Sequence, residues 1–490
     1  MGLKELTASR LIKGGILVFW AVMIALLIQK AYFPGRLPLL TAVSAGEAGE
    51  KEQWYGIYLK GQKIGNSHTR TQTHNQEIVL QDETFLNLTL LGIPRELKIS
   101  TQGKLSSDFA LQSFEFRLTS YLVDFKARGE VIGKRLFVKV TSGGVLEDIA
   151  VDFDKPPILW TALTPSLLSK GAEVGKTYRL PIFNPSTLSL QNVTVQVVGH
   201  ENLQMGESTV AATILRSEFG GLESRSWIDS SGDILKEESP MGLTTLRESQ
   251  EQALRPEKGR SVVDLLTVTA ASSSKIIPNP RELQRLRVKL KNISTNHLTL
   301  AGGRQDLRGE VLSISREIIP TNPVSFPFGG SELERFLKPE PFIQSDHPLI
   351  RENAKSIVGK ETDAVKATNL LMNWVYKSVQ KVPTVSIPSA VDVLQTLRGD
   401  CNEHAVLFTA LSRAAGIPSR IVAGIIYHEG KFYYHAWSEN YVGRWIAIDP
   451  LLNQMPADAT HIKLVEGNLD QQVPLMGVIG RLRVDVVDYK

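Results

Sequence analysis

A single cysteine, Cys401, limits how this 490-residue chain can be held together. One thiol cannot form an intramolecular disulfide, and it excludes zinc and iron–sulfur sites that need several thiolates. The fold must therefore rest on hydrophobic burial. A chain of this length, divided into roughly two to four domains, can build a sizeable core.

Composition narrows the class of protein further. The hydrophobic share of 42% and the charged share of 22% are those of a globular protein, which argues against wholesale disorder and against a polytopic membrane protein. The net charge of +4 is small for this length. It gives no reason to expect a nucleic-acid partner, because such proteins usually carry a concentrated basic surface.

An apolar run near the N-terminus, residues 14–28, predicts how the chain meets a membrane. Its length lies between that of a signal-peptide core and that of a spanning helix. Lys13 and Lys30 flank the run and can reach the two interfaces, and no small-residue cleavage site follows it directly. We therefore expect an uncleaved, single-pass signal anchor rather than a cleaved signal peptide. Basic residues before the run place the N-terminus in the cytoplasm, so the bulk of the chain is expected in the periplasm or outside the cell.

The rest of the chain divides into a β-rich part and a helix-rich part. Short segments of alternating apolar and polar residues, separated by turn residues, fill residues 53–260 and predict an antiparallel β meander or open barrel. This part is interpreted as a scaffold, and a sheet that binds a peptide, lipid or glycan is the alternative. Helical spacing of apolar residues begins near residue 342.

Cys401 lies where a helix is predicted to begin. Asp400 is a good N-cap, the apolar residues that follow repeat at helical spacing, and Gly416 marks the helix end. The first turn of a helix offers unpaired N–H groups and the positive end of the dipole, which stabilise a thiolate that can attack a carbonyl group. The Cys401 N–H is a candidate oxyanion donor, with the side chain of Trp374 or Gln395 as a candidate second donor.

Three strands are expected between residues 420 and 449, and they bring a histidine toward an aspartate. A three-residue loop at 441–443 would set His435 directly opposite Asp449, where the carboxylate can hold the imidazole tautomer. A two-residue loop would place them on opposite faces. Cys401, His435 and Asp449 are then a nucleophile, a base and an orienting acid. The alternative is a buried cysteine, an exposed strand histidine and a strand-end aspartate.

Four short motifs lie in this stretch: Gly-Asp-Cys at 399–401, Ala-Gly-Ile-Pro-Ser-Arg at 415–420, His-Ala-Trp at 435–437, and Gly-Arg-Trp with Asp-Pro at 443–450. Together they resemble the transglutaminase-like superfamily of papain-type thiol enzymes, over roughly residues 340–470. The order helix-cysteine, strand-histidine, strand-aspartate is that of the family. The resemblance implies that Cys401 is the nucleophile, His435 the general base and Asp449 the orienting carboxylate.

Other polar and aromatic residues nearby are given structural roles. His404 shares a helix face with Cys401 and is not assigned as the base, and Trp437 is expected to pack near the site. His435 and Glu439 make a weak metal pair, because four residues along a strand separate two ligands widely. We therefore predict no metal and no cofactor.

The predicted fold class is α+β. It comprises an N-terminal membrane helix, an antiparallel β-rich domain and a C-terminal papain-like or transglutaminase-like α+β catalytic domain. The predicted boundaries are 1–34 for a cytoplasmic tip and signal-anchor helix, 35–52 for a linker, 53–260 for the β-rich domain, 261–340 for a connecting β module, 341–470 for the transglutaminase-like catalytic domain and 471–490 for a C-terminal strand or tail.

The predicted function is cysteine-dependent hydrolysis or transamidation of an amide or peptide bond, outside the cytoplasm. Cys401 attacks the carbonyl carbon and expels the amine, which leaves a thioester. Water then gives hydrolysis and an incoming amine gives cross-linking, and we favour hydrolysis. The expected substrate is a protein or peptide, and the oligomeric state stays open. The alternative is a non-catalytic envelope binding or assembly protein that retains the transglutaminase-like fold.

Overall fold

The computed structural model describes residues 49–490 except 75, 91–92, 121–122, 143–144, 170–171, 231, 257–268, 383–386, 388 and 469. The predicted signal anchor and the linker up to residue 48 lie outside these residues. Among the residues that the structure describes, no helix is long and apolar enough to cross a membrane. The described chain forms two compact units, which divide close to Asp264.

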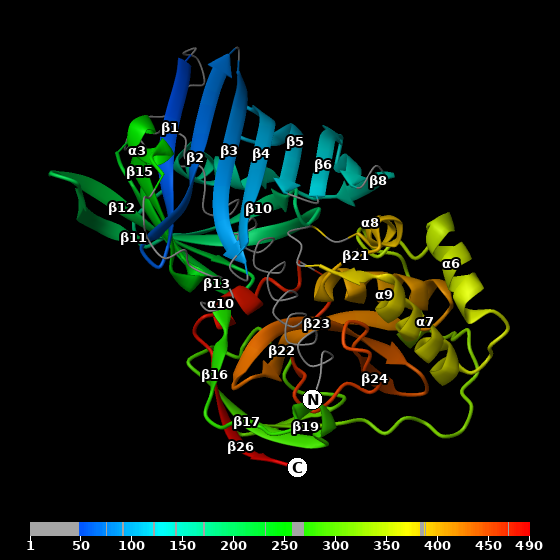
Figure 1. Cartoon of the computed structure of the whole chain (residues 1–490). Coiled ribbons are helices and arrows are strands. Elements are labelled where there is room, and N and C mark those ends of the chain that lie inside the picture. The colour runs from blue at the N-terminus through cyan, green and yellow to red at the C-terminus, as the bar shows by residue number, and fades with distance from the viewer. Residues whose placement is uncertain are drawn as a thin grey trace. The chain divides into compact units, whose positions relative to one another are not determined.

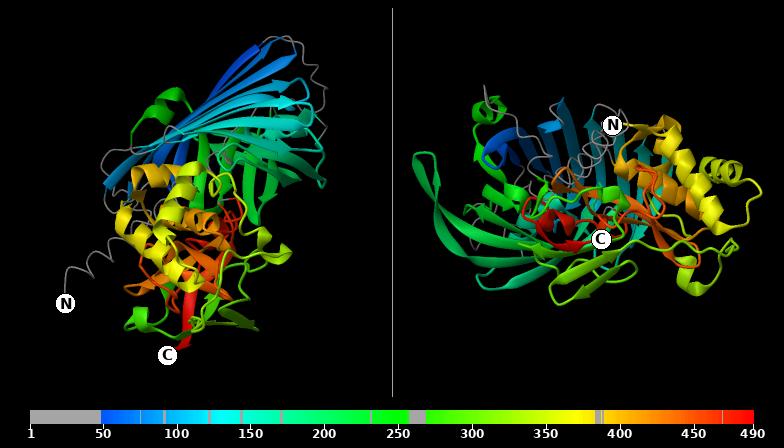
Figure 2. Two further views of the ribbon diagram at one scale, coloured as in Figure 1. Left: turned by 90° about the vertical axis from the view of Figure 1, so that its right-hand side faces the viewer. Right: turned by 60° about the horizontal axis from the view of Figure 1, so that its bottom comes forward.

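The first unit is dominated by one 15-stranded sheet with the order β8 to β1 followed by β15 to β9. Neighbours in the sheet are mostly neighbours in the chain, and β1 joins the two series by pairing with β15. The long strands lie side by side in a twisted layer (Figure 1, Figure 2). The first series is β1 (Gly49–Leu59), β2 (Gln62–His74), β3 (Glu77–Leu90), β4 (Ile93–Ser106), β5 (Leu111–Ser120), β6 (Val123–Ile132), β7 (Arg135–Ser142) and β8 (Val145–Asp152).

The second series of this sheet contains seven strands, and short helices accompany it. In β7, buried and exposed residues alternate along the strand, as expected for a sheet with one face in the core. The strands are β9 (Ile158–Leu159), β10 (Thr177–Asn184), β11 (Ser189–Met205), β12 (Ser208–Phe219), β13 (Leu222–Ile228), β14 (Ile234–Ser239) and β15 (Leu243–Glu248). The helices are η1 (Trp160–Ala162), α2 (Leu163–Ser169), η2 (Pro240–Gly242) and α3 (Gln250–Leu254).

The second unit contains a nine-stranded sheet with the order β18-β19-β17-β26-β16-β23-β22-β25, and β24 also pairs with β23. The strands are β16 (Ala271–Ser273), β17 (Arg285–Lys291), β18 (Gln305–Arg308), β19 (Val311–Ser315), β22 (Ser419–His428), β23 (Lys431–Tyr441), β24 (Trp445–Ile448), β25 (Ile462–Glu466) and β26 (Arg483–Tyr489). A two-stranded sheet pairs β20 (Gln380–Lys381) with β21 (Arg398–Gly399). The helices are η3 (Pro280–Glu282), α5 (Ser331–Glu334), α6 (Pro348–Val358), α7 (Ala364–Ser378), α8 (Ala390–Thr396), α9 (Cys401–Ala414) and α10 (Leu475–Val478).

The predicted fold class, α+β, is wrong for the described residues, and the predicted membrane helix lies outside them. The structure is 51% strand and 19% helix, and the large sheet dominates it. The helical pattern that begins near residue 342 belongs to helices that cover a nine-stranded sheet. The strands of this sheet come from before and after the helices, between Ala271 and Tyr489. Pairing between strands so far apart in the sequence leaves no periodic pattern of apolar residues.

Helix α9 is the central element of the second unit. It packs on β22 and β23, and α6, α7 and α8 pack on it in turn (Figure 1). Every residue from Cys401 to Arg413 is buried, so the helix is enclosed rather than amphipathic. Its polar side chains are accommodated by hydrogen bonds, such as Thr409 Oγ1 to Ser438 Oγ at 2.9 Å. The position of Cys401 is therefore held by packing around the whole helix.

Gly424 sets the spacing of the strands next to this helix. A Cβ atom at this position would lie 2.0 Å from the carbonyl oxygen of Ile462 on β25. Only glycine lets β25 approach β22 this closely. On its other side Gly424 is paired with His435 of β23, so the close approach occurs beside a predicted site residue.

Candidate active site

The helix start at Cys401 and its N-cap are confirmed. The Asp400 side chain accepts hydrogen bonds from the Asn402 N–H at 3.2 Å and from the Glu403 N–H, and the Glu403 carboxylate in turn accepts one from the Asp400 N–H at 2.9 Å. This reciprocal pair is a capping box. At Gly399 a Cβ atom would lie 2.3 Å from the Glu403 Cβ, so a larger residue would displace the side chain that closes the box.

A series of polar contacts runs along α9 and β23 and aligns the two elements. Asn402 Oδ1 accepts from Tyr434 Oη at 3.1 Å, and Ser412 Oγ accepts from Asn440 Nδ2 at 3.0 Å. The start of the helix therefore lies beside the segment of the strand that contains His435. In agreement, the Cys401 sulfur accepts a hydrogen bond from the backbone N–H of Ala436, the residue after His435.

The electrostatic environment of Cys401 differs from the one expected at a helix N-terminus. Burial raises the pKa of the thiol well above its usual value, the Asp400 carboxylate raises it further, and the Ala436 N–H opposes them. The dipole argument fails here because the capping box places two carboxylates, Asp400 and Glu403, at the positive end of the helix. In this structure Cys401 is a buried, protonated thiol.

His435 and Asp449 meet, although not by the predicted register. Tyr441 pairs with Trp445, so the loop is 442–444 and the pairing is displaced by two residues from the prediction. The predicted position of His435 directly opposite Asp449 is wrong. A displacement by an even number of residues keeps both side chains on one face of the sheet. They therefore meet diagonally, with His435 Nε2 2.7 Å from Asp449 Oδ2 and both side chains fully buried.

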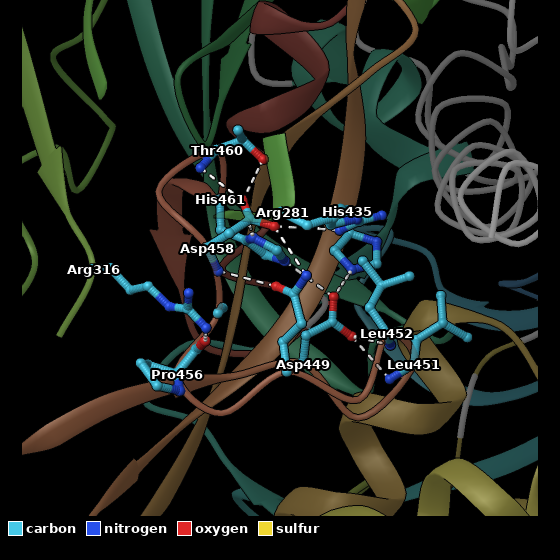
Figure 3. A network of polar contacts seen from close by, with 12 residues as sticks. Arg281, Arg316, His435, Asp449, Leu451, Leu452, Pro456, Asp458, Thr460 and His461 are labelled. Carbon is cyan, nitrogen blue, oxygen red and sulfur yellow. Dashed lines mark hydrogen bonds and ion pairs between the residues drawn. The ribbon is translucent and has the colours of Figure 1, made fainter. Parts of the chain in front are cut away.

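Asp449 accepts four hydrogen bonds (Figure 3). Oδ1 accepts from the backbone N–H groups of Leu451 at 2.8 Å and Leu452 at 2.9 Å. Oδ2 accepts from His435 Nε2 and, at 3.0 Å, from His461 Nε2. Burial alone would raise the pKa of Asp449, but its contacts with His435 and with the charged His461 hold it well below its usual range. Asp449 is an ionised carboxylate with its acceptor positions filled.

His461 is held between two carboxylates. Its Nε2 faces Asp449, and its Nδ1 lies 3.3 Å from Asp458 Oδ1. Ionised carboxylates accept hydrogen bonds and donate none, so both ring nitrogens must carry hydrogen and His461 is an imidazolium. Burial alone would lower the pKa of His461, but Asp458 and Asp449 raise it above its usual value. Arg281 lies 3.3 Å from Asp458, so two cations balance two carboxylates in this network.

His435 is neutral in this arrangement. Burial lowers its pKa, and Asp449 opposes this while His461 and Arg281 add to it. Because Nε2 donates to Asp449, Nδ1 is the unprotonated nitrogen, and it has no hydrogen-bond partner among the described residues. Trp437 stacks on His435, with ring centroids 6.2 Å apart, so the prediction that Trp437 packs near the site is confirmed.

Other residues considered from the sequence take different positions. His404 Nδ1 lies 2.6 Å from the Asp400 carbonyl oxygen, and burial lowers its pKa to about 4. Gln395 is exposed on α8 and Trp374 is half-buried on α7. The sequence gives no signal for Lys381, whose pKa burial lowers to about 8.

The side chains of His435, Asp449 and His461 form the cluster in which a metal ion would be sought. Their donor atoms all lie within 4.8 Å of one another. Both imidazole Nε2–H groups are donated to Asp449, so neither nitrogen offers a lone pair in this arrangement. The geometry is that of a hydrogen-bonded charge network.

His461, Asp458 and Arg281 were missed from the sequence. Asp458 and His461 lie three residues apart in a loop after the Asp-Pro motif, which is a weak signal by itself. Their significance depends on the fold, because it is the return of the chain into β25 that places His461 against Asp449. Arg281 comes from η3, far away in the sequence, and no local pattern could have identified it.

Comparison with known proteins supports the resemblance at the level of the superfamily. Residues 351–450 match the family model of the transglutaminase-like superfamily. The matched segment includes Cys401, His435 and Asp449 and ends before Asp458 and His461. An uncharacterized protein of Haemophilus influenzae is 33% identical over 99 residues, which are 19% of this chain and 27% of that protein. The chain thus spans about a quarter of the length of this relative.

Solved structures show only distant similarity. A candidate cysteine protease from Cytophaga hutchinsonii is 17% identical with a TM-score of 0.29, covering 42% of this chain and 89% of that one. A β-barrel-like protein of a domain of unknown function from Brucella abortus is 12% identical with a TM-score of 0.32, covering 41% and 94%. A candidate protease from Parabacteroides distasonis is 9% identical with a TM-score of 0.19, covering 71% and 68%.

Proposed function

We propose that the chain is a cysteine-dependent enzyme that cleaves an amide or peptide bond, with Cys401 as nucleophile, His435 as base and Asp449 as orienting carboxylate. The observation that carries the proposal is the buried 2.7 Å hydrogen bond from His435 Nε2 to Asp449 Oδ2, next to a thiol in the first turn of α9. This hydrogen bond leaves Nδ1 as the basic nitrogen of His435.

The reaction begins from the neutral pair. The thiol proton moves to His435 Nδ1 as the sulfur attacks the carbonyl carbon, and the negative charge develops on the carbonyl oxygen. The Cys401 backbone N–H is the proposed oxyanion donor. When the C–N bond breaks, His435 returns the proton to the leaving amine and a thioester remains. His435 then removes a proton from water, which attacks the thioester, and the acid product and the thiol are released.

The acceptor decides between the two outcomes of this chemistry. An amine in place of water gives transamidation, and we favour water, with a protein or peptide as substrate. We further propose that the apolar segment 14–28 anchors the chain in a membrane and that the residues after it lie outside the cytoplasm. This part of the proposal rests on the sequence of the first 34 residues.

One observation favours a second candidate function, a non-catalytic binding or assembly protein that retains the fold. Cys401, His435 and Asp449 are each 0% exposed, and the thiol pKa is raised. An enzyme with this resting structure must open to admit a substrate. A binding protein has no such requirement, so access to Cys401 distinguishes the two candidates.

Alkylation of Cys401 tests the proposal, because the chain has no other thiol. The full-length protein, folded and in detergent, is treated with iodoacetamide from pH 5 to 10, and the modified fraction is followed by mass spectrometry. Release of amines from casein is measured in parallel. An enzyme shows amine release that is lost in Cys401→Ala and reduced at least about a hundredfold in His435→Ala, the range for a missing general base. The exposed His297→Ala is the matched control.

The results separate the two candidates. If alkylation follows one pH profile in the wild type and in His435→Ala, and no amine is released, then His435 does not activate the thiol and the binding protein is favoured. A His435-dependent profile without amine release would keep the activated pair and reject casein as a substrate.

A further inference from the structure

Six arginines line a cleft of about 900 Å³ in the second unit. Its walls come from β17, β18, β19, the residues after β19 and the hairpin between β23 and β24. The arginines are Arg285, Arg287, Arg304, Arg308, Arg316 and Arg444. Only two carboxylates, Asp306 and Glu317, share the lining, so the cleft carries a surplus of four positive charges.

Half of these arginines are not neutralised within the protein. Among the described residues, no carboxylate pairs with Arg285, Arg316 or Arg444. Arg308 pairs with Asp306 of the same strand at 2.7 Å, and Arg287 pairs with a carboxylate outside the lining. Like charges confined in one cleft repel one another, and an anionic ligand would relieve that repulsion.

Buried N–H groups in the lining also lack acceptors. The Arg304 side chain is 0% exposed. Its Nη2 donates to the carbonyl oxygens of Ala457 and Asp458, both at 2.8 Å. Its Nε and Nη1 have no hydrogen-bond partner among the described residues, and Nε is 3.6 Å from Glu317 Oε2. Arg316 Nε is likewise unsatisfied. Unsatisfied buried donors are costly, and they leave the positive charge beneath the cleft only partly compensated, which favours an anion above it.

The floor of the cleft has the repeat of an extended peptide. Arg285 and Arg287 lie two residues apart on β17, opposite Ser315 and Ser313 of β19, and all four belong to one face of the sheet. Residues two apart in a strand are separated by about 7 Å, which is also the spacing of alternate side chains in an extended ligand. At the rim, Ile318 is 77% exposed and offers an apolar contact.

We propose that this cleft binds an acidic, extended polypeptide segment through its carboxylates. A nucleic acid fits less well, because single-strand binding relies on free aromatic faces. The Trp445 ring is already contacted by Arg420 at 4.4 Å and by Phe336 at a centroid distance of 4.8 Å. This binding does not depend on the thiol chemistry proposed above.

Fluorescence anisotropy with the full-length protein tests the proposal. The probe is a fluorescein-labelled peptide of ten glutamates, and an unlabelled (dT)₁₀ oligonucleotide is the competitor. Arg285→Ala/Arg444→Ala removes two exposed arginines that have no carboxylate partner, while Arg304 and Arg316 are kept because they hold the loop at 456–458. The control, Arg351→Ala/Lys366→Ala, removes two exposed charges from α6 and α7.

The proposal expects saturable binding that weakens with salt, that is at least about tenfold weaker in the cleft variant, and that is unchanged in the control. The oligonucleotide should compete less well than unlabelled decaglutamate. Equal binding by the two double variants would overturn the cleft as the site. Stronger competition by (dT)₁₀ would overturn the peptide as its ligand. Neither outcome depends on whether Cys401 is reactive.

Discussion

The charge on His461 should control the basicity of His435, and removing it provides a quantitative test. The His435 and His461 ring centroids are 5.7 Å apart. With an effective dielectric constant of about 20, two unit charges at this distance repel by about 3 kcal/mol. In His461→Gln, which can still donate a hydrogen bond to Asp449, the pKa of His435 should therefore rise by about two units.

This shift can be measured directly. The protein is labelled with ¹³C at histidine Cε1, the His435 resonance is assigned by substitution among the nine histidines, and its chemical shift is followed from pH 4 to 10. Thr460→Val is the matched control, because it removes a 2.6 Å hydrogen bond to Asp458 Oδ1 without changing any charge. It should leave the pKa of His435 nearly unchanged.

Three outcomes bear on the reasoning. If the pKa of His435 rises by less than about half a unit in His461→Gln, residue 461 is not an imidazolium, because removing a full positive charge at this distance should raise it by about two units. An equal rise in Thr460→Val would assign the effect to loosening of the loop instead. If His461→Gln does not fold, Asp458→Asn tests the same point, since the amide NH₂ of asparagine can donate to His461 Nδ1, which then needs no proton.

Further substitutions test the packing and the electrostatics around the site. In Gly424→Ala the new Cβ would lie 2.0 Å from the Ile462 carbonyl oxygen, so urea unfolding should show a free energy of unfolding lower by about 3 kcal/mol. In the control Gly199→Ala the added Cβ meets no atom within 4 Å, and the loss should be less than about 1 kcal/mol. The pKa of His404 is about 4 in the folded protein and about 6.5 in the unfolded chain, so between these pH values the unfolded state binds a proton that the folded state does not. The free energy of unfolding should therefore fall by about 3 kcal/mol as the pH drops from 6.5 to 4. Urea titrations of His404→Gln should show a smaller fall. Asp400→Asn keeps a good cap but removes a charge beside the thiol, so Cys401 alkylation should shift to lower pH while stability changes by less than about 0.5 kcal/mol.

The local parts of the candidate site were predictable because short-range rules determine them. Asp400 caps the helix, Cys401 begins it, and Gly416 follows its end, as the residue types require. The hairpin was harder, because the position of the loop sets the pairing, and the observed three-residue loop is 442–444 rather than the predicted 441–443. The error did not separate His435 from Asp449, since a displacement of two residues preserves the face of the strand.

Long-range features were beyond the sequence. The predicted fold class was wrong because strand pairing between distant segments leaves no periodic pattern in the sequence. Helices, by contrast, are recognised from apolar residues that recur every three or four positions. The raised pKa of Cys401 depends on how completely α9 is enclosed, which the order of its residues does not determine. The His461 network needed the loop before β25 and the distant Arg281 to converge on one carboxylate.

The sequence by itself determined the lone thiol, its position in the first turn of a helix, and the identities of the histidine and aspartate that follow it on strands. These follow from composition, capping and alternation, which act over a few residues. The tertiary structure alone decided that Asp449 is shared between two imidazoles, that His461 is charged, and that the thiol is buried and protonated. Such properties depend on solvent exclusion and on charges brought within a few ångströms from distant segments, and folding alone creates that environment.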